Sequence, residues 1–171
     1  MSSKTDFSPE EWTRVAASPM LVCTAISAAD PSGLWGLMKE ASAGGFALAQ
    51  AKQDANANPL ARALADYFTN SDTRTAITSK VQAVFKEAKA SEVKDRALGE
   101  LRAIASILDT KAPQDAPAFK NWLQDIAQKA AETAKEGGFL GFGGVAVSDA
   151  EKVTLAEISA ALGATSPRPQ A

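Results

Sequence analysis

The chain has 171 residues, a net charge of −2 and a pI near 5.2; 46% of its residues are hydrophobic and 22% are charged. These values are typical of one folded domain with a full core, and they exclude a disordered chain and a broadly basic nucleic-acid-binding surface. The absence of histidine excludes histidine-based catalysis and metal ligation, and a single cysteine, Cys23, excludes an intrachain disulfide and a thiolate zinc cluster. We therefore expect no catalytic residues, no metal site and no cofactor.

The first helix is predicted to begin after Ser8. Ser8 is suited to the N-cap, Pro9 to the first helical position, and Glu11 completes a capping box. Phe7 and Trp12 occupy the two positions of a hydrophobic staple around this start.

The same pattern of a capping residue followed by proline recurs at residues 18–19, 30–31 and 58–59. It predicts helices near residues 9–17, 19–29, 31–53 and 59–69. An alternative is that the first two form one kinked helix with Pro19 in its interior.

Two apolar stripes at helical spacing follow, after a helix start at Asp72. Their phases differ, so we predict a break or kink near residues 90–91. The first stripe contains Ile77, Val81, Val84, Phe85 and Ala88, and the second contains Val93, Ala97, Leu101, Ile104 and Leu108.

The C-terminal part is predicted to hold two more helices. Pro113 and Pro117 frame a connection, and a further stripe leads toward Gly137. Ser148 and Glu151 form a second capping box before the last helix, with Gly163 as its C-cap. The two stripes are Phe119, Trp122, Leu123, Ile126, Ala130 and Ala134, then Val153, Leu155, Ile158 and Leu162.

These patterns predict an all-α fold: a single-domain bundle of about six to eight helices with a glycine-rich apolar loop before the last one. The domain spans residues 1–171, with an ordered core over 7–163 and flexible ends at 1–6 and 164–171. The apolar run 20–29 is too short to span a membrane, and Glu10 and Glu11 precede it where an export signal carries positive charge. A cytoplasmic location is therefore expected.

The glycine-rich segment is the candidate interaction loop. One interpretation is structural: its phenylalanines plug one end of the bundle, while the glycines permit a tight path. A second is a docking patch for another chain or an apolar ligand, and a third is a flexible connector. The candidate residues are Gly137, Gly138, Phe139, Leu140, Gly141, Phe142, Gly143, Gly144 and Val145.

Two anion-binding interpretations of this segment are also open. Residues 141–146 match a dinucleotide-binding pattern, but a helix precedes them where that motif requires a strand. The backbone N–H groups before Ser148 form a generic anion site, although Asp149 and Glu151 already place negative charge there.

Other residues with reactive or bulky side chains favour structural roles. Cys23 lies in an apolar helical run and is expected to be buried and inert. Trp12, Trp35 and Trp122 are dispersed, as core anchors are. The pairs Asp125–Lys129 and Glu92–Arg96 have the spacing of surface salt bridges on a helix.

Residues 135–144 and 147–163, together with 29–40, resemble a family of small uncharacterised bacterial helical proteins, which implies a bacterial origin. The C-terminal part is also similar to tellurite-resistance TerB-like domains, in which a loop leads into a Val-Ser-x-x-Glu helix start. The TerB-like loop carries acidic residues suited to a cation, whereas residues 137–147 contain none.

The resulting hypothesis is a non-catalytic helical interaction or scaffold protein of the bacterial cytoplasm. Its expected partner is another protein or a second copy of the chain, with no nucleic acid and no membrane span. The alternative is a small-molecule-binding or anion-binding, stress-linked helical module of the TerB-like kind.

Overall fold

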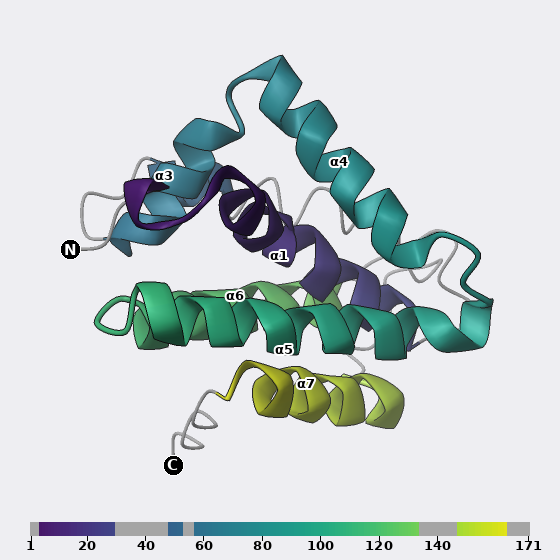
Figure 1. The fold of residues 1–171 in the computed structure, drawn as a ribbon. Coiled ribbons are helices and arrows are strands. Elements are labelled where there is room, and N and C mark those ends of the chain that lie inside the picture. The colour runs from purple at the N-terminus through teal and green to yellow at the C-terminus, as the bar shows by residue number, and fades with distance from the viewer. Residues whose placement is uncertain (1–3, 30–47, 53–56, 134–146, 164–171) are drawn as a thin grey trace, which may run out of the picture.

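The computed structural model describes residues 4–29, 48–52, 57–133 and 147–163, and all the regular structure in these ranges is helical (Figure 1). The all-α, single-domain bundle is therefore confirmed. The helices are α1 Pro9–Ser27, α3 Pro59–Tyr67, α4 Ser71–Phe85, α5 Val93–Lys111, α6 Ala116–Thr133 and α7 Asp149–Leu162, with 3-10 turns at Lys4–Asp6 and Ala90–Glu92. Residues 48–52 are also helical.

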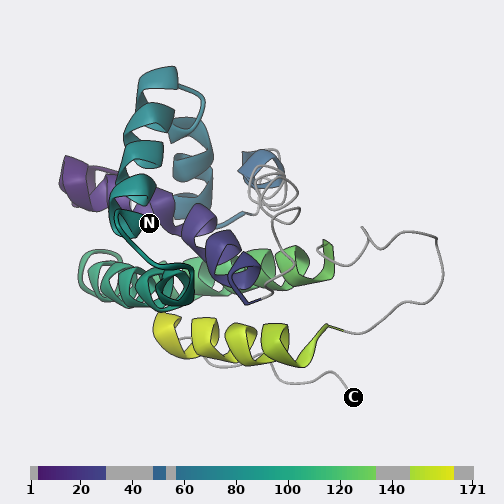
Figure 2. The ribbon, with the colours of Figure 1, turned by 90° about the vertical axis from the view of Figure 1, so that its right-hand side faces the viewer.

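The helices are arranged around a central pair, α5 and α6, which lie side by side. α1 crosses one face of this pair, and α3 and α4 lie above α1. α7 lies on the opposite side, below the pair, as the two perpendicular views show (Figures 1 and 2). α1 contacts α4, α5, α6 and α7. The first helix of the chain is therefore the one that joins the layers.

The hydrophobic core is shared by all the helices. Trp12 is fully buried near the start of α1, with its ring 5.3 Å from Phe7 and 6.1 Å from Tyr67 between centroids. The Phe7–Trp12 contact is the predicted hydrophobic staple. Other large, fully buried side chains include Leu21, Ile26, Leu60, Leu64, Ile77, Leu101, Ile104, Leu108, Phe119, Leu123, Ile126, Ile158 and Leu162.

The predicted helix start at residues 18–19 is wrong, and the alternative of one helix with Pro19 in its interior is confirmed: α1 runs from Pro9 to Ser27 through Pro19. A proline has no N–H, so Pro19 cannot donate to the carbonyl of Val15 four residues earlier. The Ser18 hydroxyl donates to that same carbonyl at 2.6 Å, and Ser18 is fully buried. Ser18 therefore supplies, inside the helix, the hydrogen bond to Val15 that Pro19 cannot make. The sequence pattern predicts an N-cap at this position instead.

The other helix starts agree with the sequence more closely. The capping boxes at Ser8 and Ser148 are present, and Asn58 caps α3 by accepting from the amides of residues 60 and 61. α4 begins slightly earlier than predicted, because Asn70 accepts from the Asp72 amide at 2.7 Å. The predicted helix 31–53 lies outside the described residues except for 48–52.

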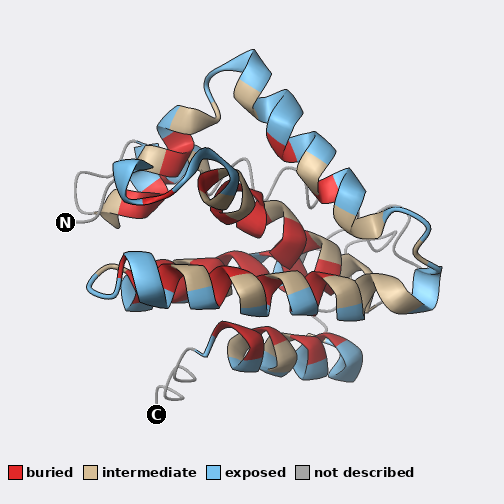
Figure 3. Ribbon diagram, in the orientation of Figure 1, coloured by how far each residue is buried: buried red, intermediate tan, exposed pale blue. Residues whose placement is uncertain are grey.

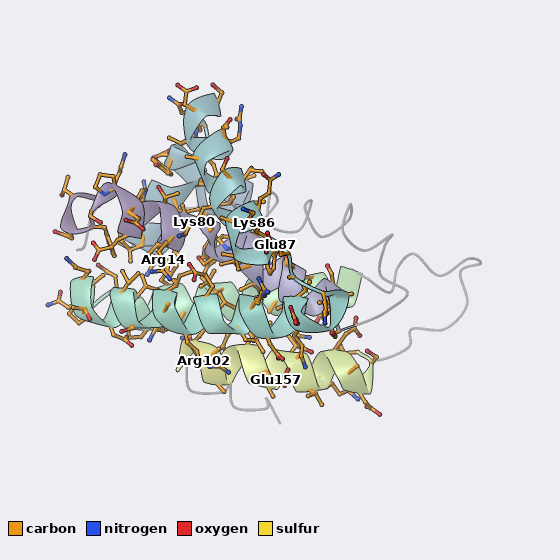
Figure 4. The ribbon with its side chains drawn as sticks, turned by 45° about the vertical axis from the view of Figure 1, so that its right-hand side comes forward. Arg14, Lys80, Lys86, Glu87, Arg102 and Glu157 are labelled. Atoms are coloured by element: carbon orange, nitrogen blue, oxygen red, sulfur yellow. The ribbon has the colours of Figure 1, made fainter. Side chains whose placement is uncertain are left out.

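The predicted break between the two middle stripes is confirmed at the corner between α4 and α5. The chain makes a type II turn there: Lys86 has φ −55° and ψ 126°, Glu87 has φ 59°, and the Ala88 amide donates to the Phe85 carbonyl at 3.0 Å. Arg96 on α5 donates to the Lys86 carbonyl at 2.9 Å and so holds the corner from the next helix. Figure 4 shows Lys86 and Glu87 at this end of α4.

Replacing Ser18 with alanine should lower the free energy of unfolding by about 1–3 kcal/mol, because the buried Val15 carbonyl loses its donor. Ser27→Ala is the matched control: the Ser27 hydroxyl bonds the Cys23 carbonyl at 3.1 Å in a stretch of helix without proline. That variant should stay within about 0.5 kcal/mol of the parent. Urea unfolding of both variants measures the difference, and equal losses would contradict the proposed repair.

Replacing Glu87 with glycine should stabilise the protein. A side chain in the left-handed region costs roughly 1–2 kcal/mol, whereas the entropic cost of glycine is about 0.5–1 kcal/mol, so we expect a gain of up to about 1 kcal/mol. Glu87→Ala removes the same charge and keeps the Cβ atom, so it should give no such gain. The midpoint of urea unfolding compares the three proteins, and a glycine variant no more stable than the alanine variant would contradict this account.

Candidate functional site

The predicted interaction loop, residues 137–145, lies outside the described residues. The description resumes at Val147, which is half-buried and packs against the core just before α7. The candidate surface that the structure does describe is on α7 itself.

The N-terminus of α7 is capped by its own side chains. Glu151 is buried and its Oε2 accepts from the Ser148 amide at 2.8 Å and from the Ser148 hydroxyl at 2.6 Å. The Ser148 hydroxyl in turn accepts from the Glu151 amide at 3.3 Å. A carboxylate thus already occupies the position that an anion would take at this helix start.

The inward side of α7 is fixed to the bundle by packing and by polar contacts. Ile158 and Leu162 are fully buried against the core. Glu157 pairs with Lys94 of α5 at 2.8 Å, and its position on α7 beneath α5 is visible in Figure 4. The Gln124 amide of α6 donates to the Ser159 hydroxyl at 3.1 Å.

The C-terminus of α7 lies beside a buried lysine of α6. The side chain of Lys120 is only 6% exposed, and its Nζ contacts both carboxylate oxygens of Asp109 at 2.7 Å. The same Nζ lies 4.0 Å from the position that a Cβ on Gly163 would take, where α7 ends in the left-handed conformation at φ 61°. A cation there stabilises the negative end of the helix dipole, and α7 has no basic residue in its own last turn.

The outward side of α7 carries Val153 and small residues, next to the exposed, charged Asp149 and Lys152. Val153 is 55% exposed, and among the described residues it is the large hydrophobic side chain left open to solvent. Ala156, Ala160 and Gly163 follow at helical spacing and are also exposed. Figure 3 shows this side of the helix in pale blue and tan, with the buried side turned toward α5. We call these four residues the outer face of α7.

The outer face corrects the stripe predicted from the sequence. Ile158 and Leu162 are buried and Leu155 is partly buried as expected, but Val153 points to solvent. Residues 153, 156, 160 and 163 are three or four positions apart, so they form a second stripe on the opposite side of the helix. Counting both stripes, rather than one, would have found this surface in the sequence.

Where they are described, the other residues singled out from the sequence are packed in the core or paired with a neighbouring side chain. Cys23 and Trp12 are buried and Trp122 is half-buried against the core, while Trp35 lies outside the described residues. The predicted Glu92–Arg96 pair is present at 3.2 Å. In the part of the chain that the structure describes, no three acidic or cysteine side chains gather as metal ligands would.

Among the described residues, two ionisable groups have clearly shifted pKa values, and both hold helix positions. The two hydrogen bonds that Arg14 donates to the Glu100 carboxylate of α5, at 2.7 and 2.8 Å, raise the pKa of Arg14. Figure 4 shows where Arg14 lies on α1. The backbone N–H of Ser8 lowers the pKa of the Glu11 carboxyl, with smaller contributions from the Ser8 hydroxyl and from Lys111. These contacts fix α1 against α5 and at its own start.

Breaking the Lys120–Asp109 pair should have unequal consequences. Asp109→Ala leaves a buried ammonium without its partner and should cost about 3 kcal/mol. Lys120→Met keeps most of the buried stem and leaves a carboxylate that is 60% exposed, so we expect a loss of about 1–2 kcal/mol. Urea unfolding of both variants checks this order, and a larger loss for Lys120→Met would contradict it.

No helix in the described ranges has the length and apolar character needed to cross a membrane. No protein-family model, no curated protein and no solved structure matches the chain. The surfaces of the molecule are therefore the basis for a proposed function.

Proposed function

We propose that the protein is a non-catalytic helical interaction module of the cytoplasm, which binds a helix through the outer face of α7. The observation that supports this proposal is the pair of apolar stripes on α7. A helix with one apolar stripe buries that stripe by packing on the bundle. A helix with a second apolar stripe leaves it exposed to solvent, where a partner can bury it.

The size of the side chains on the outer face favours a helix as the bound element. Ala156, Ala160 and Gly163 are small, and small residues let a second helix approach to a short interaxial distance. Val153 supplies the larger apolar contact at one end. Lys152 and Glu157 flank the stripe and would form a polar rim around the buried contact.

The glycine-rich segment 137–145 directly precedes α7 in the chain. Its part in binding remains the prediction made from the sequence. Phe142→Ala, included in the assay below, tests whether this segment contributes to the same contact.

A photo-reactive amino acid placed at position 156 tests the proposed docking face. We expect p-benzoylphenylalanine at this position to form covalent adducts in the cells that produce the protein, because it lies in the middle of the contact. The matched control is position 118, which is an exposed alanine on α6. Val153→Glu in the same chain should suppress the adducts, since it places a charge in the apolar contact.

Adducts that form at position 156, are absent at position 118 and depend on Val153 support the proposal, and mass spectrometry identifies the bound chain. Adduct yields that are equal at the two positions would overturn it.

A further inference from the structure

We draw no further inference here: the strongest candidate, the aromatic side-chain cluster of Phe7, Trp12 and Tyr67 at the start of α1, in which the buried indole N–H of Trp12 has no hydrogen-bond partner among the described residues, carries none, because Trp12 is fully buried and nothing in the structure shows a ligand or partner that would accept from it.

Discussion

The Ser18 hydroxyl donates to the Val15 carbonyl, which Pro19 leaves without a backbone donor, and so supports α1 as one continuous helix. The arrangement of the other helices depends on that continuity. α1 is 19 residues long and contacts α4, α5, α6 and α7. A break at Pro19 would leave two short helices, each able to cover part of the central pair. Because the repaired helix stays whole, its buried side chains from Trp12 to Ile26 form one continuous surface.

The ion pairs between helices set the position of each helix along its neighbour. Arg14–Glu100 links α1 to α5, Lys94–Glu157 links α5 to α7, and Lys120–Asp109 links α6 to α5. Such pairs add modest stability when partly exposed, but their fixed geometry favours one register over others. In an alanine-rich bundle this matters, because many of the buried contacts are between side chains of similar size. Lys94–Glu157, together with the buried Ile158 and Leu162, holds α7 with one side inward, and so determines which residues form its outer face.

Much of the fold could be predicted from the sequence, because caps and apolar stripes are local patterns. Ser8, Asn58 and Ser148 each begin a helix as their sequence context indicates, and Gly163 ends one. Ser18–Pro19 has the same pattern with the opposite outcome. The difference lies in tertiary packing: Ser18 is buried against the core, and this burial cannot be predicted from the neighbouring residues in the sequence. The left-handed Glu87 has no sequence signal either, since glycine is the residue that such a turn normally favours.

The candidate site could be predicted less well than the fold. The glycine-rich segment drew attention because of its composition, and it lies outside the described residues. The outer face of α7 was present in the sequence as a regular spacing of Val153, Ala156 and Ala160, but alanines are common in every helix of this chain. Deciding which of two stripes faces the bundle requires the neighbouring helices. That information is tertiary, so the sequence shows both stripes but does not show which of them is exposed.

The position of α1 has a consequence for the order in which the chain folds. Its partners α5, α6 and α7 lie between 66 and 153 residues further along the sequence. During synthesis α1 leaves the ribosome before α5, α6 and α7, so its apolar surface lacks these partners until residues 93–162 have followed. Contacts so distant in sequence slow folding relative to bundles built from neighbouring helices. The nascent chain therefore exposes the apolar side of α1 until these partners have been synthesised, and apolar surface exposed at that stage favours aggregation.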